Sequence, residues 1–173
     1  MVEIRTLTEA DIDAVAEVHV RTWQSAYAAI IPAEVLDALD PTVWAERRRQ
    51  SGPPPTGQTL VADDDGTVIG FAAFGPRRIQ PGTEYDFTEG ELYAIYVNPR
   101  YQHKGAGKRL FAAARAALTE AGFPVLRLWV LEENHPARRF YEHLGMAPDG
   151  DHHHYTPRGS TVELPEVRYA ARL

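Results

Sequence analysis

Two glycines and three cationic side chains lie close together in the segment Gln102–Arg109, which reads Gln-His-Lys-Gly-Ala-Gly-Lys-Arg. Glycine lets a backbone turn tightly and approach a ligand closely. A helical pattern follows, and the first turn of a helix offers unpaired N–H groups and a positive dipole end, where phosphate oxygens bind well. Lys104, Lys108 and Arg109 add positive charge. The segment can therefore hold a phosphate, although a plain strand-to-helix turn explains the glycines equally well.

The glycine spacing excludes two common phosphate-binding motifs. A Walker A loop needs a glycine where the chain has Gln102, and a serine or threonine where it has Arg109. A dinucleotide-binding fingerprint that starts at Gly105 needs a further glycine where Leu110 stands. What remains is a pyrophosphate held by a Gln-x-x-Gly-x-Gly loop that ends at Gly107.

The elements beside this loop follow from the pattern of apolar residues. The segment Glu91–Val97 is rich in β-branched and aromatic residues and predicts a strand. Residues 108–121 carry apolar side chains at helical spacing before a glycine, which predicts a helix and its end. The nearly continuous apolar run 125–131 predicts a buried strand, and residues 136–144 predict another helix.

The flanking segments predict helices at the N-terminal end, then a hairpin, and two weaker strands at the C-terminal end. Thr8 and Asp11 fit a capping box for a first helix that begins near Glu9. The other expected elements are a short helix after Pro32, a helix after Asp40-Pro41, strands over 59–62, 67–74, 151–155 and 162–170, and loops over 51–58 and 77–90. This order predicts an α/β fold with a mixed, mostly antiparallel sheet, one central parallel strand pair and flanking helices.

Two blocks of sequence, in register with these elements, resemble the GNAT superfamily of N-acetyltransferases. The first is Glu91–Val97 followed by Gln102-x-x-Gly-x-Gly107, which is similar to the strand and acetyl-CoA loop of that family. The second is Leu128-x-Val130 followed by Asn134-x-x-Ala137-x-x-Phe140-Tyr141-x-x-Leu144-Gly145-Met146. The resemblance spans residues 91–147. It implies a GNAT-like fold and one N-acetyltransferase domain over residues 1–173, which uses acetyl-CoA as co-substrate, without a metal, to acetylate a primary amine.

The resemblance also implies roles for individual residues. The Val97 N–H would face the thioester carbonyl. Tyr141 would be the general acid for the leaving thiolate, because an ordinary tyrosine pKa of about 10 keeps the phenol protonated at neutral pH. Asn134 would bind the pantetheine chain, although an asparagine at this position also fits a helix N-cap. The implied cofactor-binding residues are Ile95, Tyr96, Val97, Gln102, His103, Lys104, Gly105, Ala106, Gly107, Lys108, Asn134 and Tyr141.

Glu91, at the start of the central strand, is the candidate general base. It would act directly or through water, because the attacking amine must lose a proton. A solvated strand end is the alternative interpretation. Strand alternation places Tyr93 on the same side of the sheet as Glu91. Together with Glu84, Asp86 and Glu89, Glu91 forms an acidic stretch that either attracts a cationic acceptor or is a solvated loop.

The composition narrows the possible chemistry. The 173 residues include no cysteine, which excludes a cysteine acetyl-enzyme and thiolate metal sites and favours direct attack in a ternary complex. His152, His153 and His154 suggest a metal site, but no ligand set of recognisable spacing completes it, and we expect no metal. Residues 1–90 hold 15 acidic and 7 basic residues, against 9 and 11 in residues 91–173, so an anion should bind in the second half.

Location and partners are predicted only in outline. The net charge of −6 argues against nucleic-acid binding. No apolar run approaches the roughly 20 residues of a membrane span, and no signal-peptide pattern opens the chain, so we expect a cytoplasmic protein. The acceptor is a small-molecule amine or a peptide or protein amine, and the oligomeric state is a monomer or a homodimer. The rival functions are a non-catalytic acyl-CoA-binding or regulatory domain and a nucleotide-phosphate-binding module. The joint presence of Asn134 and Tyr141 favours the enzyme.

Overall fold

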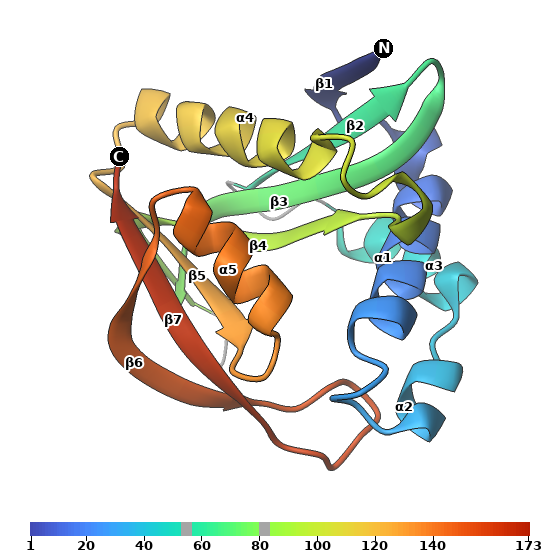
Figure 1. Cartoon of the computed structure of the whole chain (residues 1–173). Coiled ribbons are helices and arrows are strands. Elements are labelled where there is room, and N and C mark those ends of the chain that lie inside the picture. The colour runs from blue at the N-terminus through green and yellow to red at the C-terminus, as the bar shows by residue number, and fades with distance from the viewer. Residues whose placement is uncertain (53–56, 80–83) are drawn as a thin grey trace.

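The computed structural model of the chain describes residues 1–52, 57–79 and 84–173. Within these residues, seven strands form one sheet in the order β1-β2-β3-β4-β5-β7-β6 (Figure 1). Neighbouring strands are antiparallel except for β4 and β5, which run parallel. The strands are β1 (Val2–Thr6), β2 (Gln58–Asp64), β3 (Thr67–Ile79), β4 (Glu84–Val97), β5 (Val125–Leu131), β6 (Ala147–Tyr155) and β7 (Leu164–Arg172).

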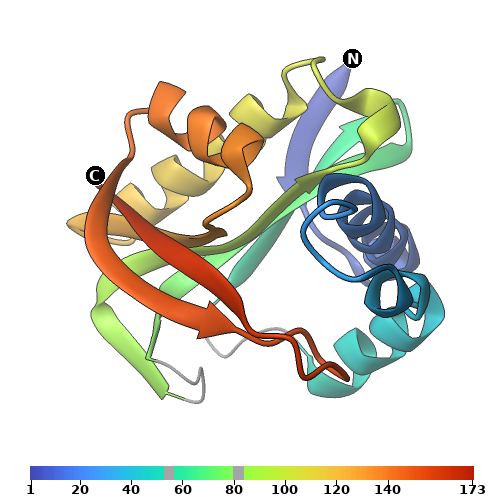
Figure 2. The same ribbon diagram turned by 60° about the horizontal axis from the view of Figure 1, so that its bottom comes forward.

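Helices cover both faces of the sheet. Helices α4 and α5 lie on one face, and α1, α2 and α3 lie on the other (Figures 1 and 2). The predicted fold class is therefore confirmed. Among the described helices, none has both the length and the apolar character that crossing a membrane requires. The helices are α1 (Ile12–Ala26), α2 (Ala33–Asp37), α3 (Pro41–Ser51), α4 (Ala106–Glu120) and α5 (His135–His143), with short 3-10 turns at Glu9–Asp11 and Pro99–Tyr101.

Alternation along the central strands explains why both faces are buried. In β2 and β3, Val61 and Phe71 pack under α1, whereas the next residues, Ala62 and Ala72, pack under α4. The small alanines let α4 lie close to the sheet. As a result, the strands in the middle of the sheet are fixed from both sides.

Strands β4 and β5 separate soon after they meet. Their parallel pairing consists of Gly90 with Leu126 and Glu91 with Arg127. Beyond this point, the rest of β4 pairs with β3 and the rest of β5 pairs with β7. In the described part of the chain, the facing edges of β4 and β5 therefore carry backbone N–H and C=O groups that no neighbouring strand occupies. A ligand with polar groups of its own can bind between these edges.

Some predicted boundaries are wrong. Residues 77–90 are not a loop where the structure describes them, because β3 continues to Ile79 and β4 begins at Glu84. Polar side chains of β3 and β4 form ion pairs with each other across the two strands. The polar composition of this segment therefore reflects paired strands and not a loop. Strand β1 is missed by the sequence prediction, and α4 begins at Ala106 rather than at residue 108. Residues 80–83, and residues 53–56 of the other predicted loop, lie outside the described residues.

Both predicted caps at the N-terminal end are confirmed. The Thr8 amide donates to Asp11 Oδ2 at 2.8 Å, and Asp40 Oδ1 accepts from the Thr42 amide at 2.8 Å. Arg5 of β1 donates to Asp11 as well, with Nη1 at 2.7 Å from Oδ2. This ion pair anchors the start of α1 on the edge of the sheet.

Candidate active site

A cleft of about 1150 Å³ occupies the gap between β4 and β5. Its walls come from the facing strand edges, the loop before α4, the inner sides of α1 and α5, and the ends of β6 and β7. All but one of the residues predicted to bind the cofactor line it. The exception is Lys104, whose ammonium lies 5.2 Å from the centre of the Tyr101 ring. The lining residues from that prediction are Ile95, Tyr96, Val97, Gln102, His103, Gly105, Ala106, Gly107, Lys108, Asn134 and Tyr141.

The loop before α4 ends in a conformation that suits glycine. Gly105 has a φ of 79° and is the N-cap of α4, a left-handed conformation in which other residues are strained. The first turn of α4 follows directly, so the N–H groups of Ala106, Gly107 and Lys108 have no partner one turn earlier in the helix. All three residues line the cleft, and Lys108 adds a full positive charge to the positive end of the helix dipole. They fit an anion such as a pyrophosphate.

The end of β4 presents a backbone donor to the gap. The Asn98 amide donates to the Ile69 carbonyl of β3 at 2.8 Å. Because successive amides of a strand point to opposite sides, the Val97 N–H points away from β3 and toward the gap. The Val97 carbonyl accepts from Thr22 Oγ1 at 3.3 Å and from Gln102 Nε2 at 3.2 Å. These bonds hold the strand end against α1 and against the phosphate loop (residues 102–107).

Tyr141 lies on α5, with 8% of its surface exposed, and borders the cleft. Its ring packs near those of Phe111, Phe140 and Tyr169. Burial, with a smaller effect of Tyr96, raises the pKa of Tyr141 well above its ordinary value. The phenol therefore keeps its proton at neutral pH, which a general acid requires.

Asn134 also borders the cleft and is buried. Its Oδ1 accepts from the Ala137 amide at 3.3 Å, so the N-cap interpretation is confirmed. The contact with pantetheine stays a prediction. A cap fixes the rotamer of the side chain, which would position its amide group at the mouth of the gap.

Aromatic side chains form the cleft wall on the α1 face. The His19 ring lies 4.3 Å from the Trp44 ring and 5.1 Å from the Trp23 ring, measured between centres. Burial lowers the pKa of His19 to about 4, so this imidazole is neutral at pH 7. Among the residues that the structure describes, His19 Nδ1 and Trp23 Nε1 are buried without a hydrogen-bond partner. A molecule bound here would meet apolar rings and a few polar atoms able to pair with it.

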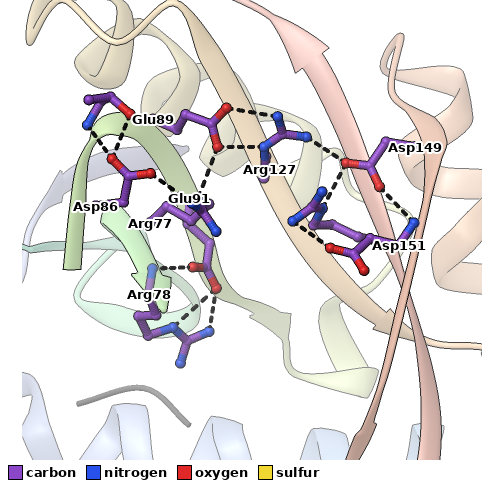
Figure 3. A network of polar contacts seen from close by, with 10 residues as sticks. Arg77, Arg78, Asp86, Glu89, Glu91, Arg127, Asp149 and Asp151 are labelled. Carbon is purple, nitrogen blue, oxygen red and sulfur yellow. Dashed lines mark hydrogen bonds and ion pairs between the residues drawn. The ribbon is translucent and has the colours of Figure 1, made fainter. Parts of the chain in front are cut away.

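Glu91, the predicted base, is 1% exposed and is not among the described residues that line the cleft. Its Oε1 accepts from Arg78 Nη2 at 2.6 Å and from Nε at 3.1 Å, and its Oε2 accepts from the Arg78 amide at 2.7 Å (Figure 3). The Arg78 guanidinium also lies 4.5 Å from the centre of the Tyr93 ring. Tyr93 and Glu91 therefore lie on the same side of the sheet, as strand alternation predicts. Direct proton abstraction by Glu91 would require this ion pair to open.

Arginine side chains also pair with two other carboxylates of the acidic stretch, Asp86 and Glu89. Arg77 Nη2 lies 2.7 Å from Asp86 Oδ2, and Arg127 donates twice to Glu89 at 2.7 Å. Arg127 reaches Asp149 on the other side, so the network crosses from β3 to β6 (Figure 3). Glu89 of β4 and Arg127 of β5 are thus joined where the two strands pair. Asp86 and Glu89 are thus paired with arginines, whereas Glu84 is exposed. Attraction of a cationic acceptor by this stretch stays a prediction.

His153 of β6 and Glu166 of β7 also line the cleft. They are register partners, and His153 Nε2 lies 2.5 Å from Glu166 Oε2. The His153 ring also packs on Trp129, with 4.0 Å between centres. Over residues 1–52, 57–79 and 84–173, no group of three or more His, Cys, Asp or Glu side chains is arranged to hold a metal ion.

Sequence reasoning missed Arg78, Trp129 and Glu166 as cleft residues. Strand alternation in 164–172 does place Leu164 and Glu166 on one face. The pattern does not reveal that this face meets α1 and the strand gap, because that depends on how β7 pairs with β5. Only the three-dimensional arrangement brings these side chains together.

Known proteins share this arrangement. Residues 16–146 match the Acetyltransferase (GNAT) family. The chain is 36% identical to an uncharacterized N-acetyltransferase of Bacillus subtilis, YuaI, over 142 residues, which are 82% of this chain and 78% of that protein. It is 29% identical to the L-amino acid N-acyltransferase MnaT of Escherichia coli over 143 residues, or 83% of this chain and 78% of MnaT.

A solved structure of the PaiA N-acetyltransferase from Thermoplasma acidophilum, in complex with coenzyme A, has the same fold. The TM-score is 0.76 with 24% sequence identity, and the match covers 100% of this chain and 99% of that one. The family match includes the opened strand pair, the phosphate loop and the helix that carries Tyr141. On this evidence, the chain belongs to the GNAT family of acetyl-CoA-dependent N-acetyltransferases.

Proposed function

We propose that residues 1–173 act as one N-acetyltransferase domain that transfers an acetyl group to a primary amine by direct attack within a ternary complex. One observation carries the proposal. The cleft connects the phosphate loop and Tyr141, beside α4 and α5, with the aromatic wall beside α1. A donor and an acceptor can therefore be held together in one cavity, which can supply several kcal/mol of the reaction barrier, about 7–11 in favourable cases.

The residues that would hold acetyl-CoA follow from the geometry of the cleft. Acetyl-CoA supplies the activated acetyl group. The first turn of α4 and Lys108 would bind its pyrophosphate, and the free edges of β4 and β5 would bind the pantetheine arm. Ile95, Tyr96 and Asn134 would lie along that arm. The other loop residues, Gln102 to Gly107, would shape the turn around the phosphates.

Two groups of the chain would act on the reacting atoms of the bound acetyl-CoA. The Val97 N–H would donate to the carbonyl oxygen as that oxygen gains negative charge. Tyr141 would donate its proton to the leaving sulfur. No cysteine is present to carry the acetyl group, which supports direct attack.

The acceptor would enter from the α1 face. MnaT carries the name L-amino acid N-acyltransferase, so free L-amino acids are the first class to test. A polyamine and a short peptide with a free N-terminus are the next. The buried aromatic wall favours an acceptor with an apolar part beside its amine.

Calorimetric titration with acetyl-CoA tests the first half of the proposal, with free CoA and ATP as comparison ligands. We expect saturable one-site binding that is tighter than for ATP. A screen of the amines above for thiol release then tests the second half. Binding without thiol release from any amine would support a non-catalytic acyl-CoA-binding domain instead. Absence of binding to any CoA species would overturn the proposal.

A further inference from the structure

The carboxylate of Glu166 is the acidic group that faces into the cleft from β7. Its side chain is 15% exposed, and Tyr96 and Tyr27, whose pKa values it helps to raise, line the same cleft. His153 Nε2 binds one of its oxygens, Oε2, at 2.5 Å. No partner of Oε1 is recorded within the described residues, so this oxygen is left for a bound molecule.

His153 is itself fixed in place. Its backbone pairs with Glu166 between β6 and β7, and its ring packs on Trp129. Arg168 covers the Trp129 ring, with its guanidinium carbon 5.6 Å from the ring centre. Because the His153 ring is packed in place, its hydrogen bond holds the Glu166 carboxylate in one orientation.

The surroundings of Glu166 affect how strongly it binds a proton. Burial raises the pKa of Glu166 above its ordinary value, and the hydrogen bond from His153 opposes this effect in part. A carboxylate of this kind accepts a proton more readily than an exposed one. The titratable and charged groups that face it are His153 and Tyr155 from β6, Arg78 from β3, Glu91 and Tyr96 from β4, and Tyr27 after α1.

Glu91 differs from Glu166 in its hydrogen-bond partners and in its position. Both oxygens of Glu91 already accept hydrogen bonds from Arg78, and the side chain is not among those that line the cleft within the described residues. Arg78, which binds the Glu91 carboxylate, itself lines the cleft. An acceptor amine in the cleft would therefore meet Glu166 and not Glu91.

We propose that Glu166, oriented by His153, is the general base that takes the proton from the acceptor amine. This assignment rests on the acetyl transfer proposed above. The acceptor arrives as an ammonium, and its first proton passes to Oε1 of Glu166, which later releases it to solvent. The neutral nitrogen forms its bond to the acetyl carbon, and the carbon–sulfur bond breaks. Tyr141 gives a proton to sulfur, and the second proton of the nitrogen restores the Tyr141 phenol.

The test compares Glu166→Gln with the wild-type full chain. The readout is kcat/KM for thiol release between pH 6 and pH 9, with acetyl-CoA and the L-amino acid that reacts fastest in the screen. We expect a loss of about 100-fold at pH 7. The rate of the variant should rise with pH until the amine deprotonates by itself. The Kd for acetyl-CoA should stay unchanged, which separates this result from a failure of the proposed function.

Three further variants decide between the possible bases. Glu163→Gln makes the same change on an exposed residue beside β7 and should keep the wild-type rate. Glu91→Gln should reduce the rate far less than Glu166→Gln does. Glu166→Asp keeps a carboxylate and should retain part of the activity with a wild-type pH profile. If Glu166→Gln kept the wild-type rate and pH profile in an active enzyme, or if Glu91→Gln caused the larger loss, the assignment to Glu166 would be overturned.

Discussion

Burial in one cleft raises the pKa of both Tyr141 and Glu166, which favours the protonated form of each. The Tyr141 phenol therefore holds a proton before the reaction, as a general acid must. The raised pKa of Glu166 lets its carboxylate accept a proton more readily, as a general base must. The two residues come from α5 and β7, so the acid and the base of the proposed reaction belong to separate elements.

Tyr141→Phe tests the acid. Removing the hydroxyl leaves the ring packing intact, so we expect kcat to fall by about 100-fold, with no change in the Kd for acetyl-CoA. Steady-state thiol release and calorimetry measure the two quantities. Tyr169→Phe is the matched control, because its hydroxyl bonds to Glu142 and Arg138 and it is not one of the described cleft residues. The control should lower stability by about 1–2 kcal/mol and keep kcat. Equal rates for Tyr141→Phe and wild type would remove the acid role.

At the level of single elements, the phosphate loop joins a strand that opens the sheet to a helix that starts with free donors. Its turn depends on the positive φ of Gly105. Gly122, just after α4, also has a positive φ, at 86°. A Cβ at either glycine would meet no atom within 4 Å. Substitution by a residue with a side chain should therefore cause similar backbone strain at both positions. Of these two described residues, Gly105 lines the cleft and Gly122 does not.

Gly105→Ala and Gly122→Ala form a matched pair. Both should lower the free energy of unfolding by roughly 1–2 kcal/mol, since alanine is strained at positive φ. Only Gly105→Ala should also weaken acetyl-CoA binding, because the first turn of α4 would shift away from the phosphates. Urea unfolding and calorimetry give the two measurements. A comparable loss of affinity in Gly122→Ala would mean that strain in α4, and not the loop geometry, controls binding.

The elements between residues 91 and 147 could be predicted from the sequence because their local signals agree. Hydrophobic periodicity, glycine stops and the loop motif all point to the same strand–helix–strand–helix order. Residues 77–90 could not be predicted, because the arginines and carboxylates in this segment find their partners across strands. Glu166 was missed for a related reason. A lone glutamate in a weak strand becomes a cleft residue only through the β5–β7 pairing.

For the molecule as a whole, the buried imidazole of His19 links stability to pH. Burial lowers its pKa from 6.5 to about 4. Between these values the unfolded chain binds a proton that the folded chain does not, so stability is lost as the pH falls from 6.5 toward 4. The contribution of His19 to this loss is about 3 kcal/mol at pH 4.

His19→Phe should therefore flatten the acid side of the stability curve, because an aromatic ring without a titrating nitrogen still fills the space beside Trp23 and Trp44. Urea unfolding at pH 7, 5.5 and 4.5 measures the effect. His143→Gln, at an exposed histidine on α5, should follow the wild-type curve. If His19→Phe and wild type lost stability in parallel, the acid sensitivity would lie in other groups.

The gap between β4 and β5 joins the two faces of the sheet, and each face contributes a different part of the chain to the cleft. In the proposed reaction, acetyl-CoA would be held largely by backbone groups of β4, β5 and the first turn of α4, which many side-chain substitutions leave unchanged. The acceptor amine would instead meet side chains from α1, β6 and β7. Substitutions on the second face can therefore change which amine is accepted while the first face keeps its ligand. This division offers a route by which a single scaffold can acquire new acceptors during evolution, and a set of positions at which to redesign this enzyme.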